Sequence, residues 1–335
     1  MKKVCILGAG SWGTALAILL HKNGHQVTVW SIDPAEVLML RDYREQRDKL
    51  PGVMVPSAIE FTTDLETALK DKELVVCAVP SPFVRSTMKS AAPYILEGTI
   101  VVDVAKGIES HTYKTMTEII KEECPQARVG ILSGPSHAEE VGRGIPTTIV
   151  SGSDSKEVAE IIQDTFMNDF FRVYTSPDVI GIESGGSVKN VIALAAGVVD
   201  GLGFGDNTKA ALITRGVAEL SRLVTAMGGH IETVAGLSGI GDLIVTCTSK
   251  HSRNRNAGYL IGQGMTYQEA MDEVKMVVEG VYSAKAALEL SKKYHVSMPI
   301  VEAVNRVLFE GDTAKEAAAI LFSRDKTMEA DNLEW

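Results

Sequence analysis

A glycine-rich segment near the amino terminus has the spacing of a dinucleotide-binding turn. It reads Gly8-Ala9-Gly10-Ser11-Trp12-Gly13 and lies between a β-branched apolar run and a helix-like run. In this setting the first glycine permits a tight turn, the second lets the backbone approach a pyrophosphate, and the third lets helix and strand pack closely. The helix would offer its first N–H groups and its positive dipole end to the phosphates. The segment therefore predicts a nucleotide cofactor, with Gly8, Gly10 and Gly13 among its binding residues.

Asp33 follows the second expected strand and bears on which cofactor is bound. An acid at this strand tip commonly accepts hydrogen bonds from the adenosine ribose of NAD, whereas NADP sites tend to use an arginine. The tip reads Trp30-Ser31-Ile32-Asp33 and contains no arginine. Asp33 could equally cap the next helix, because Asp33-Pro34 fits an N-cap followed by a first-turn proline. Both interpretations remain open from the sequence.

Two further motifs follow expected strands in the first half of the chain. Lys106 comes shortly after one apolar strand pattern, and the segment from Ser133 to His137 follows the next. The carboxyl ends of parallel strands meet at one edge of a sheet, where ligands bind. We therefore expect a functional Lys106 at this edge, and a capping box formed by Ser136 and Glu139. A catalytic role for the lone His137 is the less favoured interpretation.

Lys189 is an isolated cation in a long, mostly apolar stretch. The helix pattern around it is apolar on nearly all sides, so the helix should be buried. Burial lowers the pKa of an unpaired lysine, and such a lysine can donate or accept a proton near neutral pH. Gly185 and Gly186, one turn earlier on the same face, would leave room for a ligand beside the ammonium. The competing interpretation is a structural ion pair with an acid such as Glu183 or Asp242.

Asp242 precedes a segment that is suited to anion binding. Residues 249–256 contain three cations and no acid, in a chain whose net charge is −10. The neighbouring Ser252, Arg253 and Asn254 supply a positive charge and hydrogen-bond donors that fit a phosphate or a carboxylate. A solvated loop explains the same composition equally well.

These motifs lie in a chain whose pattern changes near residue 180. Before it, short β-branched runs alternate with amphipathic stretches, which predicts a parallel sheet with helices on both faces. Strands are expected at Val4–Leu7, Gln26–Trp30, Leu74–Val79, Ile100–Val104, Val129–Leu132 and Thr147–Val150. Helices are expected at Thr14–Lys22, Val84–Ala91, Val179–Val199, Lys209–Met227, Tyr267–Met271 and Ala284–Lys293. We expect an α/β protein with a doubly wound Rossmann sheet in residues 1–180 and an all-α domain in residues 181–335.

Composition narrows the class of protein and its partners. Of the 335 residues, 45% are hydrophobic and 23% are charged, which are ordinary values for a globular protein. The net charge of −10 argues against nucleic acid or an anionic membrane as a partner. Apolar runs are too short for a membrane helix, and the four scattered cysteines show no metal-binding spacing. We expect a cytoplasmic protein with reduced core thiols, no integral membrane segment and no bound metal.

Taken together, the motifs resemble those of bacterial NAD(P)-dependent glycerol-3-phosphate dehydrogenases. The resemblance covers essentially the whole chain, through GAGSWGTA, VAKGIE, SGPSHAEEV, VKNVIALAAGVVDGLGFGDN, GDLIVTCTSKHSRN and MVVEGV. It implies reduction of dihydroxyacetone phosphate to sn-glycerol 3-phosphate, the backbone precursor of phospholipids. It also implies NADH or NADPH as the cofactor, a small phosphorylated substrate and a homodimer.

The resemblance implies roles for individual residues. Lys189 looks like the catalytic acid/base for a hydride transfer to the substrate ketone. Substrate contacts are implied for Lys106, Gly134, Ser136, Lys189, Asp242, Ser252, Arg253 and Asn254. Cofactor contacts are implied for Ser11, Trp12, Lys106, Ala138, Arg253, Val277 and Glu279. Family members often have His or Arg where this chain has Ile32 and Asp33, which favours NADH tolerance over a strong NADPH preference.

Two other classes of protein remain as alternatives from the sequence. One is a related two-domain dehydrogenase that acts on a hydroxy acid or on another phosphorylated ketone. The other is a dinucleotide-binding sensor without enzymatic activity. Arg253 and its neighbours favour a phosphorylated substrate over the first alternative, and Lys189 in its glycine-flanked helix argues against the second.

Overall fold

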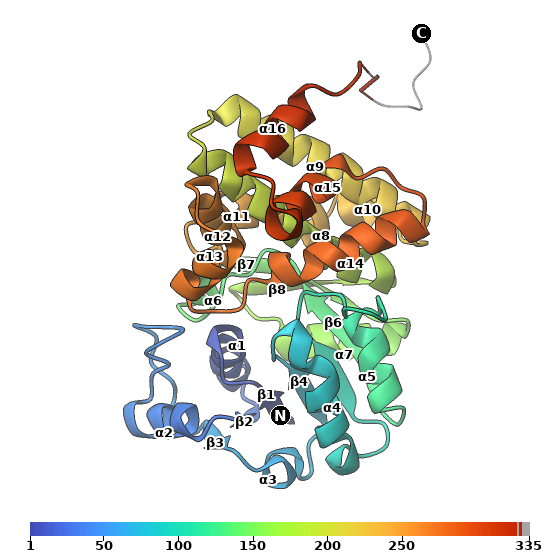
Figure 1. Ribbon diagram of the computed structural model, residues 1–335. Helices are drawn as coiled ribbons and strands as arrows, with labels where there is room; N and C mark the ends of the chain where they lie inside the picture. Colours follow the sequence, from blue (N-terminus) through green and yellow to red (C-terminus); the bar gives the residue numbers. More distant parts are fainter. Residues whose placement is uncertain (327, 330–335) are drawn as a thin grey trace.

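An eight-stranded sheet forms the lower part of the molecule, and a group of helices forms the upper part (Figure 1). The computed structural model describes residues 1–326, 328 and 329. The strands are β1 (Lys3–Leu7), β2 (Gln26–Trp30), β3 (Glu60–Thr62), β4 (Leu74–Cys77), β5 (Ile100–Asp103), β6 (Arg128–Ser133), β7 (Thr147–Gly152) and β8 (Phe171–Ser176).

The sheet has the strand order β3-β2-β1-β4-β5-β6-β7-β8. The first six of these strands are parallel to one another. This is the doubly wound Rossmann order, in which the chain reverses direction of winding between β1 and β4. β7 runs antiparallel to β6, and β8 runs parallel to β7. The expected Rossmann sheet is therefore confirmed, with an extension of two strands of opposite direction.

Alternate side chains along each parallel strand enter two separate cores, which is why these strands are apolar throughout. On β1, Val4 and Ile6 join one core, whereas Cys5 and Leu7 join the other. The first core packs against α1 (Ser11–Lys22), α2 (Pro34–Tyr43) and α7 (Lys156–Phe166). The second packs against α4 (Val84–Ala91) and α5 (Met116–Glu123). All four cysteines are buried free thiols, as expected.

Shorter elements complete this part of the chain. They are α3 (Leu65–Leu69), α6 (Ala138–Val141) and two 3-10 turns, η1 (Ser81–Phe83) and η2 (Ala92–Tyr94). The polar stretch from Arg41 to Lys49 begins in the last turn of α2 and continues as a loop.

The upper part of the molecule is built around α8 (Val179–Gly201), which begins three residues after β8 ends. It is surrounded by α9 (Asp206–Ala226), α10 (Ile231–Val234), α11 (Asp242–Thr248), α12 (Arg253–Gly262), α13 (Tyr267–Val274), α14 (Glu279–Lys293), α15 (Pro299–Asn305), α16 (Ala314–Phe322) and the π-helical turns η3 (Leu237–Gly241) and η4 (Arg306–Glu310). The expected helical carboxyl-terminal domain is confirmed (Figure 1).

Burial explains why α8 is apolar on every side. Two helical stretches, Val179–Gly201 and Ile231–Thr248, have the length and composition of a membrane span. The apolar window of the first is 94% buried inside the protein, as in the central helix of a folded domain. α8 thus serves as the core of the helical part and carries Lys189 into the interior.

Candidate active site

A cavity of about 1370 Å³ lies between the sheet and the helical domain. It is bordered by the carboxyl ends of β1, β2, β4 and β5, which is the edge of a doubly wound sheet where ligands bind. Fifteen of the residues predicted for the site line it: Gly8, Gly10, Ser11, Trp12, Asp33, Lys106, Ser136, Ala138, Lys189, Asp242, Ser252, Arg253, Asn254, Val277 and Glu279. Gly13 and Gly134 do not line it and support residues that do.

The glycine turn has the form that a pyrophosphate requires. Gly8 has φ +114, and a Cβ there would lie 2.7 Å from the carbonyl oxygen of Ala78. A Cβ on Gly13 would collide with the carbonyl oxygen of Gly8, so this glycine lets α1 pack against the turn. A Cβ on Gly10 would meet no atom within 4 Å, and α1 has no side-chain cap on its first N–H groups. These features fit the phosphates of a dinucleotide at the start of α1.

Asp33 acts as the N-cap of α2. Its side chain accepts a hydrogen bond from the backbone N–H of Ala35 at 2.9 Å, and Pro34 occupies the first turn as expected. The side chain also borders the cavity, so the capping interpretation is confirmed while a ribose contact stays a prediction.

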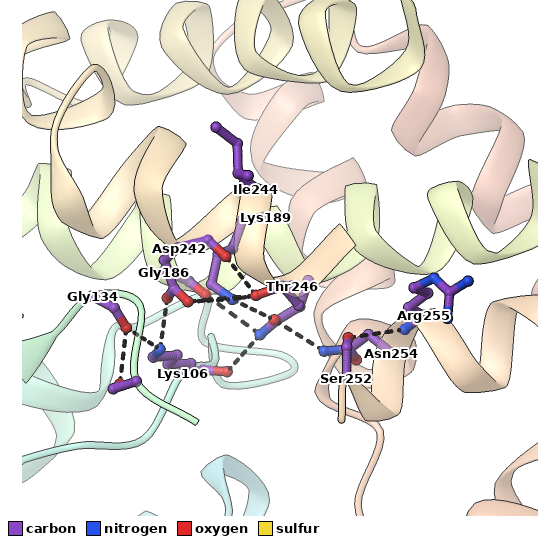
Figure 2. Close-up of polar contacts among 12 residues, drawn as sticks. Lys106, Gly134, Gly186, Lys189, Asp242, Ile244, Thr246, Ser252, Asn254 and Arg255 are labelled. Atoms are coloured by element: carbon purple, nitrogen blue, oxygen red, sulfur yellow. Dashed lines mark hydrogen bonds and ion pairs between the residues drawn. The ribbon is translucent and has the colours of Figure 1, made fainter. Parts of the chain in front are cut away.

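Lys189 is buried, with 2% of its surface exposed, and its ammonium is held by three neighbours. Nζ donates to Thr246 Oγ1 at 2.8 Å and to Asn190 Oδ1 at 3.1 Å, and it lies 3.3 Å from Asp242 Oδ1 (Figure 2). The ion pair between Lys189 and Asp242, which the sequence offered as an alternative, is therefore present. The alternative pair with Glu183 does not, because Glu183 instead accepts two hydrogen bonds from Thr117.

Burial lowers the pKa of Lys189 to about 8. The Asp242 carboxylate opposes this shift, whereas the ammonium of Lys106 reinforces it. Both protonation states of Lys189 are consequently accessible near neutral pH, which is the condition for a group that donates a proton in one direction and accepts it in the other.

Asp242 joins the two lysines across the boundary between the domains. Lys106 comes from the loop after β5, and its Nζ lies 2.6 Å from Asp242 Oδ2 and donates to the Gly134 carbonyl oxygen at 3.0 Å. Asp242 is the first residue of α11 and is 2% exposed. Figure 2 shows Lys106, Lys189 and Asp242 converging, whereas Ile244 on the same helix points away. The resulting group of charges has one carboxylate for two ammonium ions.

The glycines before Lys189 serve a purpose other than the one expected. A Cβ on Gly186 would lie 3.2 Å from Ser133 Oγ and 3.9 Å from Lys106 Cγ, and one on Gly185 would lie 3.4 Å from the Ser238 carbonyl oxygen. Protein atoms, rather than space for a ligand, occupy the room beside this face. The glycines therefore let β6 and the loop that carries Lys106 approach α8.

The loop after β6 also differs from its expected form. Gly134 has φ +144, a backbone conformation that disfavours other residues, and its carbonyl oxygen accepts bonds from Lys106 and from Ser136 Oγ. The predicted capping box is wrong, because α6 begins after His137 without a side-chain cap. Ser136 is used to close the loop instead. Burial lowers the pKa of His137, which also borders the cavity.

At the start of α12, some side chains form structural hydrogen bonds and others face the cavity. Ser252 caps α12 by accepting the N–H of Arg255 at 3.2 Å. Asn254 donates to Asn190 Oδ1 at 3.0 Å and accepts the N–H of Gly280 at 2.8 Å. Arg253 is half-buried, begins α12 and borders the cavity, so its phosphate contact stays a prediction.

Glu279 connects the helical domain to the sheet. Its carboxylate accepts hydrogen bonds from Ser81 Oγ at 2.5 Å and from the Ser81 N–H at 3.2 Å. Burial raises the pKa of Glu279. Ser81 comes from η1, just after β4, so this contact closes one side of the cavity.

Thr246 and Asn190 contact Lys189, and the sequence assigned neither of them a role. Ser81-Pro82 after a strand predicts a helix cap, but Ser81 makes no such cap and donates to Glu279 instead. Thr246 could have been found from its place one helical turn after Asp242, and Asn190 from its place beside Lys189. In residues 1–326, 328 and 329, no three or more His, Cys, Asp or Glu side chains are grouped so that they could hold a metal ion.

A Rossmann sheet whose glycine turn borders a cavity with a buried lysine of lowered pKa defines a two-domain, nicotinamide-nucleotide-dependent oxidoreductase. Residues 3–159 match the model of the NAD-dependent glycerol-3-phosphate dehydrogenase N-terminus, and residues 178–319 match that of the C-terminus. The chain therefore belongs to the NAD-dependent glycerol-3-phosphate dehydrogenase family.

Individual relatives agree along the full chain. The sequence is 61% identical over 335 residues to the glycerol-3-phosphate dehydrogenase (NAD(P)+) of Agathobacter rectalis, and the match covers 100% of both chains. It is 50% identical to the enzyme of the same name from Bacillus subtilis, over 99% of this chain and 97% of the relative. The crystal structure of glycerol-3-phosphate dehydrogenase from Coxiella burnetii superposes with a TM-score of 0.93 at 35% identity, over 96% of this chain and 99% of that one.

Proposed function

We propose that this protein catalyses the reversible reduction of dihydroxyacetone phosphate to sn-glycerol 3-phosphate with NADH or NADPH. The observation that carries the proposal is Lys189, a buried ammonium with a pKa of about 8, on the wall of the cavity that the glycine turn borders. The nicotinamide cofactor, when bound, supplies the hydride. The cavity residues must then bind the phosphate, orient the ketone and move one proton.

Lys189 is the group that moves the proton. Negative charge grows on the ketone oxygen during reduction, and a buried ammonium stabilises that charge strongly because little water screens it. Lys189 then delivers its proton to the oxygen, and Lys106 adds positive charge nearby. In the oxidation direction the neutral amine takes the hydroxyl proton. Asp242 is a positioning residue, since it contacts both lysines and fixes their separation.

Arg253 is the proposed phosphate-binding residue, assisted by Ser252 and Asn254. A guanidinium binds phosphate through two parallel hydrogen bonds, which fixes the orientation of the substrate as well as its affinity. Asn254 already bonds to Asn190, the neighbour of Lys189, so the phosphate contact and the proton donor are connected through one amide pair. Gly134, Ser136 and Lys106 complete the proposed substrate contacts from the sheet side.

The cofactor contacts of this proposal follow the cavity wall. Gly8, Gly10 and Gly13 form the turn, Ser11 and Trp12 begin α1, and Ala138 begins α6. Val277 and Glu279 border the cavity from the helical domain, together with Arg253. We also propose a division of the chain at residues 1–180 and 181–335, a homodimer, a cytoplasmic location and no integral membrane segment.

The decisive assay compares initial rates of dihydroxyacetone phosphate reduction with NADH and with NADPH. Unphosphorylated dihydroxyacetone is the control substrate, and it should react far more slowly if Arg253 recognises the phosphate. The Lys189→Met variant should lose at least 10²-fold in single-turnover rate, the ordinary contribution of a general acid, while it still binds NADH. A variant that retains the wild-type rate would remove Lys189 from the proposed mechanism.

A further inference from the structure

A buried carboxylate, Glu36, lies with three hydrogen-bond donors beside the glycine turn, at the end of β2. Glu36 accepts hydrogen bonds from Ser31 Oγ at 2.5 Å, from Gln46 Nε2 at 2.7 Å and from Lys49 Nζ at 2.7 Å. We call Ser31, Glu36, Gln46 and Lys49 the Glu36 cluster. The same Gln46 amide donates to the carbonyl oxygen of Ala9 at 2.8 Å, so the cluster is fastened to the glycine turn itself.

The position of the cluster makes it part of the cofactor cavity. Ser31, Glu36 and Lys49 all border the cavity, as do Gly10 and Trp12 from the glycine turn and α1. In a Rossmann sheet, the ribose of the adenosine half lies at the tip of β2 when the pyrophosphate is at the start of the first helix. Ser31 directly follows β2, so the cluster lies where side chains would contact that ribose.

Glu36 differs from Asp33 in its burial and in its pairing with a cation. Asp33 is exposed and already caps α2, whereas Glu36 is 7% exposed. Burial of a carboxylate is costly unless a cation and hydrogen-bond donors compensate for its lost hydration. Lys49 supplies the cation, and its side chain is 42% exposed, so it can exchange its partner without a change in the core.

We propose that the Glu36–Lys49 pair, and not Asp33, decides between a 2′-hydroxyl and a 2′-phosphate on the cofactor ribose. This inference rests on the proposed function, because it concerns the same cofactor cavity. Glu36 accepts a hydrogen bond from the ribose hydroxyl of NADH. Lys49 leaves Glu36 and binds the 2′-phosphate of NADPH. Asp33, Glu36 and Lys49 together carry one net negative charge, so the site favours NADH and tolerates NADPH through Lys49.

The other cations of the cavity, in the described part of the chain, either pair with Asp242 or come from the opposite domain. Lys106 and Lys189 contact Asp242, while Lys250, Arg253 and Lys275 come from the helical domain. Among the cavity-lining residues of the sheet domain, Lys49 is therefore the cation adjacent to the β2 tip.

The test measures binding of two cofactor fragments, 5′-AMP and 2′,5′-ADP, by isothermal titration calorimetry. These differ only in the 2′-phosphate, and neither requires turnover. Lys49→Met should weaken 2′,5′-ADP about tenfold or more, the usual effect of one charge-assisted hydrogen bond, and change 5′-AMP less than about threefold. Glu36→Gln keeps the side-chain shape, removes the negative charge and frees Lys49. It should strengthen 2′,5′-ADP about tenfold relative to 5′-AMP.

Asp33→Asn is the matched control, because asparagine caps a helix as well as aspartate does and removes the same charge. It should move the ratio of the two affinities by less than about threefold, a small fraction of the Glu36→Gln effect. The inference is overturned if Lys49→Met leaves the ratio unchanged, or if Asp33→Asn moves it as far as Glu36→Gln does. Retained 5′-AMP binding shows that each variant is folded.

The outcomes also separate this inference from the proposed function. An unchanged ratio in a wild-type protein that reduces dihydroxyacetone phosphate would overturn the Glu36–Lys49 assignment alone. If the wild-type protein binds neither fragment, nor NADH or NADPH, the proposed function and this inference both fail. Side-by-side kcat/KM values for the two dinucleotides provide the kinetic counterpart, and they should follow the ratio measured with the fragments.

Discussion

One carboxylate between two ammonium groups is the central arrangement at the scale of single residues. Asp242 contacts Lys106 and Lys189 from opposite domains, and the three side chains together carry one positive charge. An excess positive charge in a buried site is costly unless an anion arrives to compensate for it. The substrate and the developing oxyanion are such anions, so the cost of burial favours their binding.

The pKa of Lys189 predicts how the two reaction directions depend on pH. Reduction needs the ammonium, so its rate should fall as the pH rises through about 8. Oxidation needs the neutral amine, so its rate should rise through the same range. Asp242→Asn removes the charge that holds the pKa of Lys189 up. It should shift the pH–rate profiles of both reaction directions to lower pH by about one unit.

Pre-steady-state rates from pH 6 to pH 10 in both directions would check this dependence. If the pH–rate profiles of Asp242→Asn coincide with those of the wild type, a group other than Lys189 titrates. A shift of these profiles to higher pH would contradict the claim that Asp242 raises the pKa of Lys189.

Arg253 should act through substrate affinity. Arg253→Met removes the proposed phosphate contact and should raise KM for dihydroxyacetone phosphate by 10-fold or more, about 1.4 kcal/mol. Arg255→Met is the matched control, because Arg255 lies two residues away on α12 and pairs with Asp200 outside the cavity. Steady-state kinetics with saturating cofactor distinguish the two variants. Equal KM values for Arg253→Met and wild type would exclude the phosphate role.

Fifteen of the seventeen predicted site residues border the cavity, yet neither residue types nor the family resemblance showed which side chains touch. Asn254 was expected to bind substrate, and its amide is engaged by Asn190 and Gly280. Ser81 donates to Glu279, 198 positions away in the chain. Such long-range partners depend on how the two domains meet, which no local pattern encodes.

At the scale of elements, close packing of α8 on α12 sets the distance between the proton donor and the phosphate-binding residue. Gly197 of α8 faces the backbone of α12: a Cβ there would collide with the Arg255 carbonyl oxygen and lie 2.9 Å from the Tyr259 nitrogen. Because backbone atoms cannot move aside as side chains do, the helices must separate if Gly197 is replaced.

Gly197→Ala should therefore destabilise the protein by about 1–3 kcal/mol, despite the better helix propensity of alanine. It should also lower kcat/KM, since α12 begins at Arg253 and α8 carries Lys189. Gly205→Ala serves as the control, because a Cβ there meets no atom within 4 Å and φ is −82. Urea unfolding of both variants checks the difference, and equal stabilities would refute the close-packing argument.

The strands were largely predictable, with informative exceptions. All six expected strands exist within two residues of their observed ends, because buried parallel strands are continuously apolar. β3 was missed because three residues are too few for a pattern. β8 was missed because Phe171 and Val173 alternate with exposed residues at the edge of the sheet, a weaker signal than an apolar run. The antiparallel direction of β7 depends on how the chain returns to the sheet.

At the scale of the whole molecule, net charge and local charge have opposite signs. The chain carries −10 overall, yet the group formed by Lys106, Lys189 and Asp242 carries one positive charge. The net charge argued against polyanionic partners, but it could not reveal a locally positive group of side chains. Contacts that join the two domains include Lys106 with Asp242, Ser81 with Glu279, and Thr117 with Glu183.

The contact between Thr117 and Glu183 offers a test of how strongly the domains are coupled. Glu183 of α8 is buried and accepts the N–H of Thr117 at 2.9 Å and its Oγ1 at 2.5 Å. Burial raises the pKa of Glu183 above its ordinary value near 4.5, whereas the two bonds from Thr117 hold it down. Thr117→Val keeps the volume and the N–H but removes the hydroxyl donor, so the folded-state pKa should rise further.

A raised folded-state pKa gives the loss of stability a definite dependence on pH. The folded protein then binds the Glu183 proton more tightly than the unfolded chain does, so stability falls as the pH rises from about 4.5 through the folded-state pKa. Thr117→Val should cost more at pH 8 than at pH 5, about 1–2 kcal/mol at the higher pH, because an ionised carboxylate depends on its donors more than a protonated one does. Thr248→Val, which removes an exposed intrahelical hydroxyl, should show no such difference. Urea unfolding followed by circular dichroism at both pH values measures the effect. A loss for Thr117→Val that is equal at pH 5 and pH 8 would show that the Glu183 carboxylate does not depend on the opposite domain.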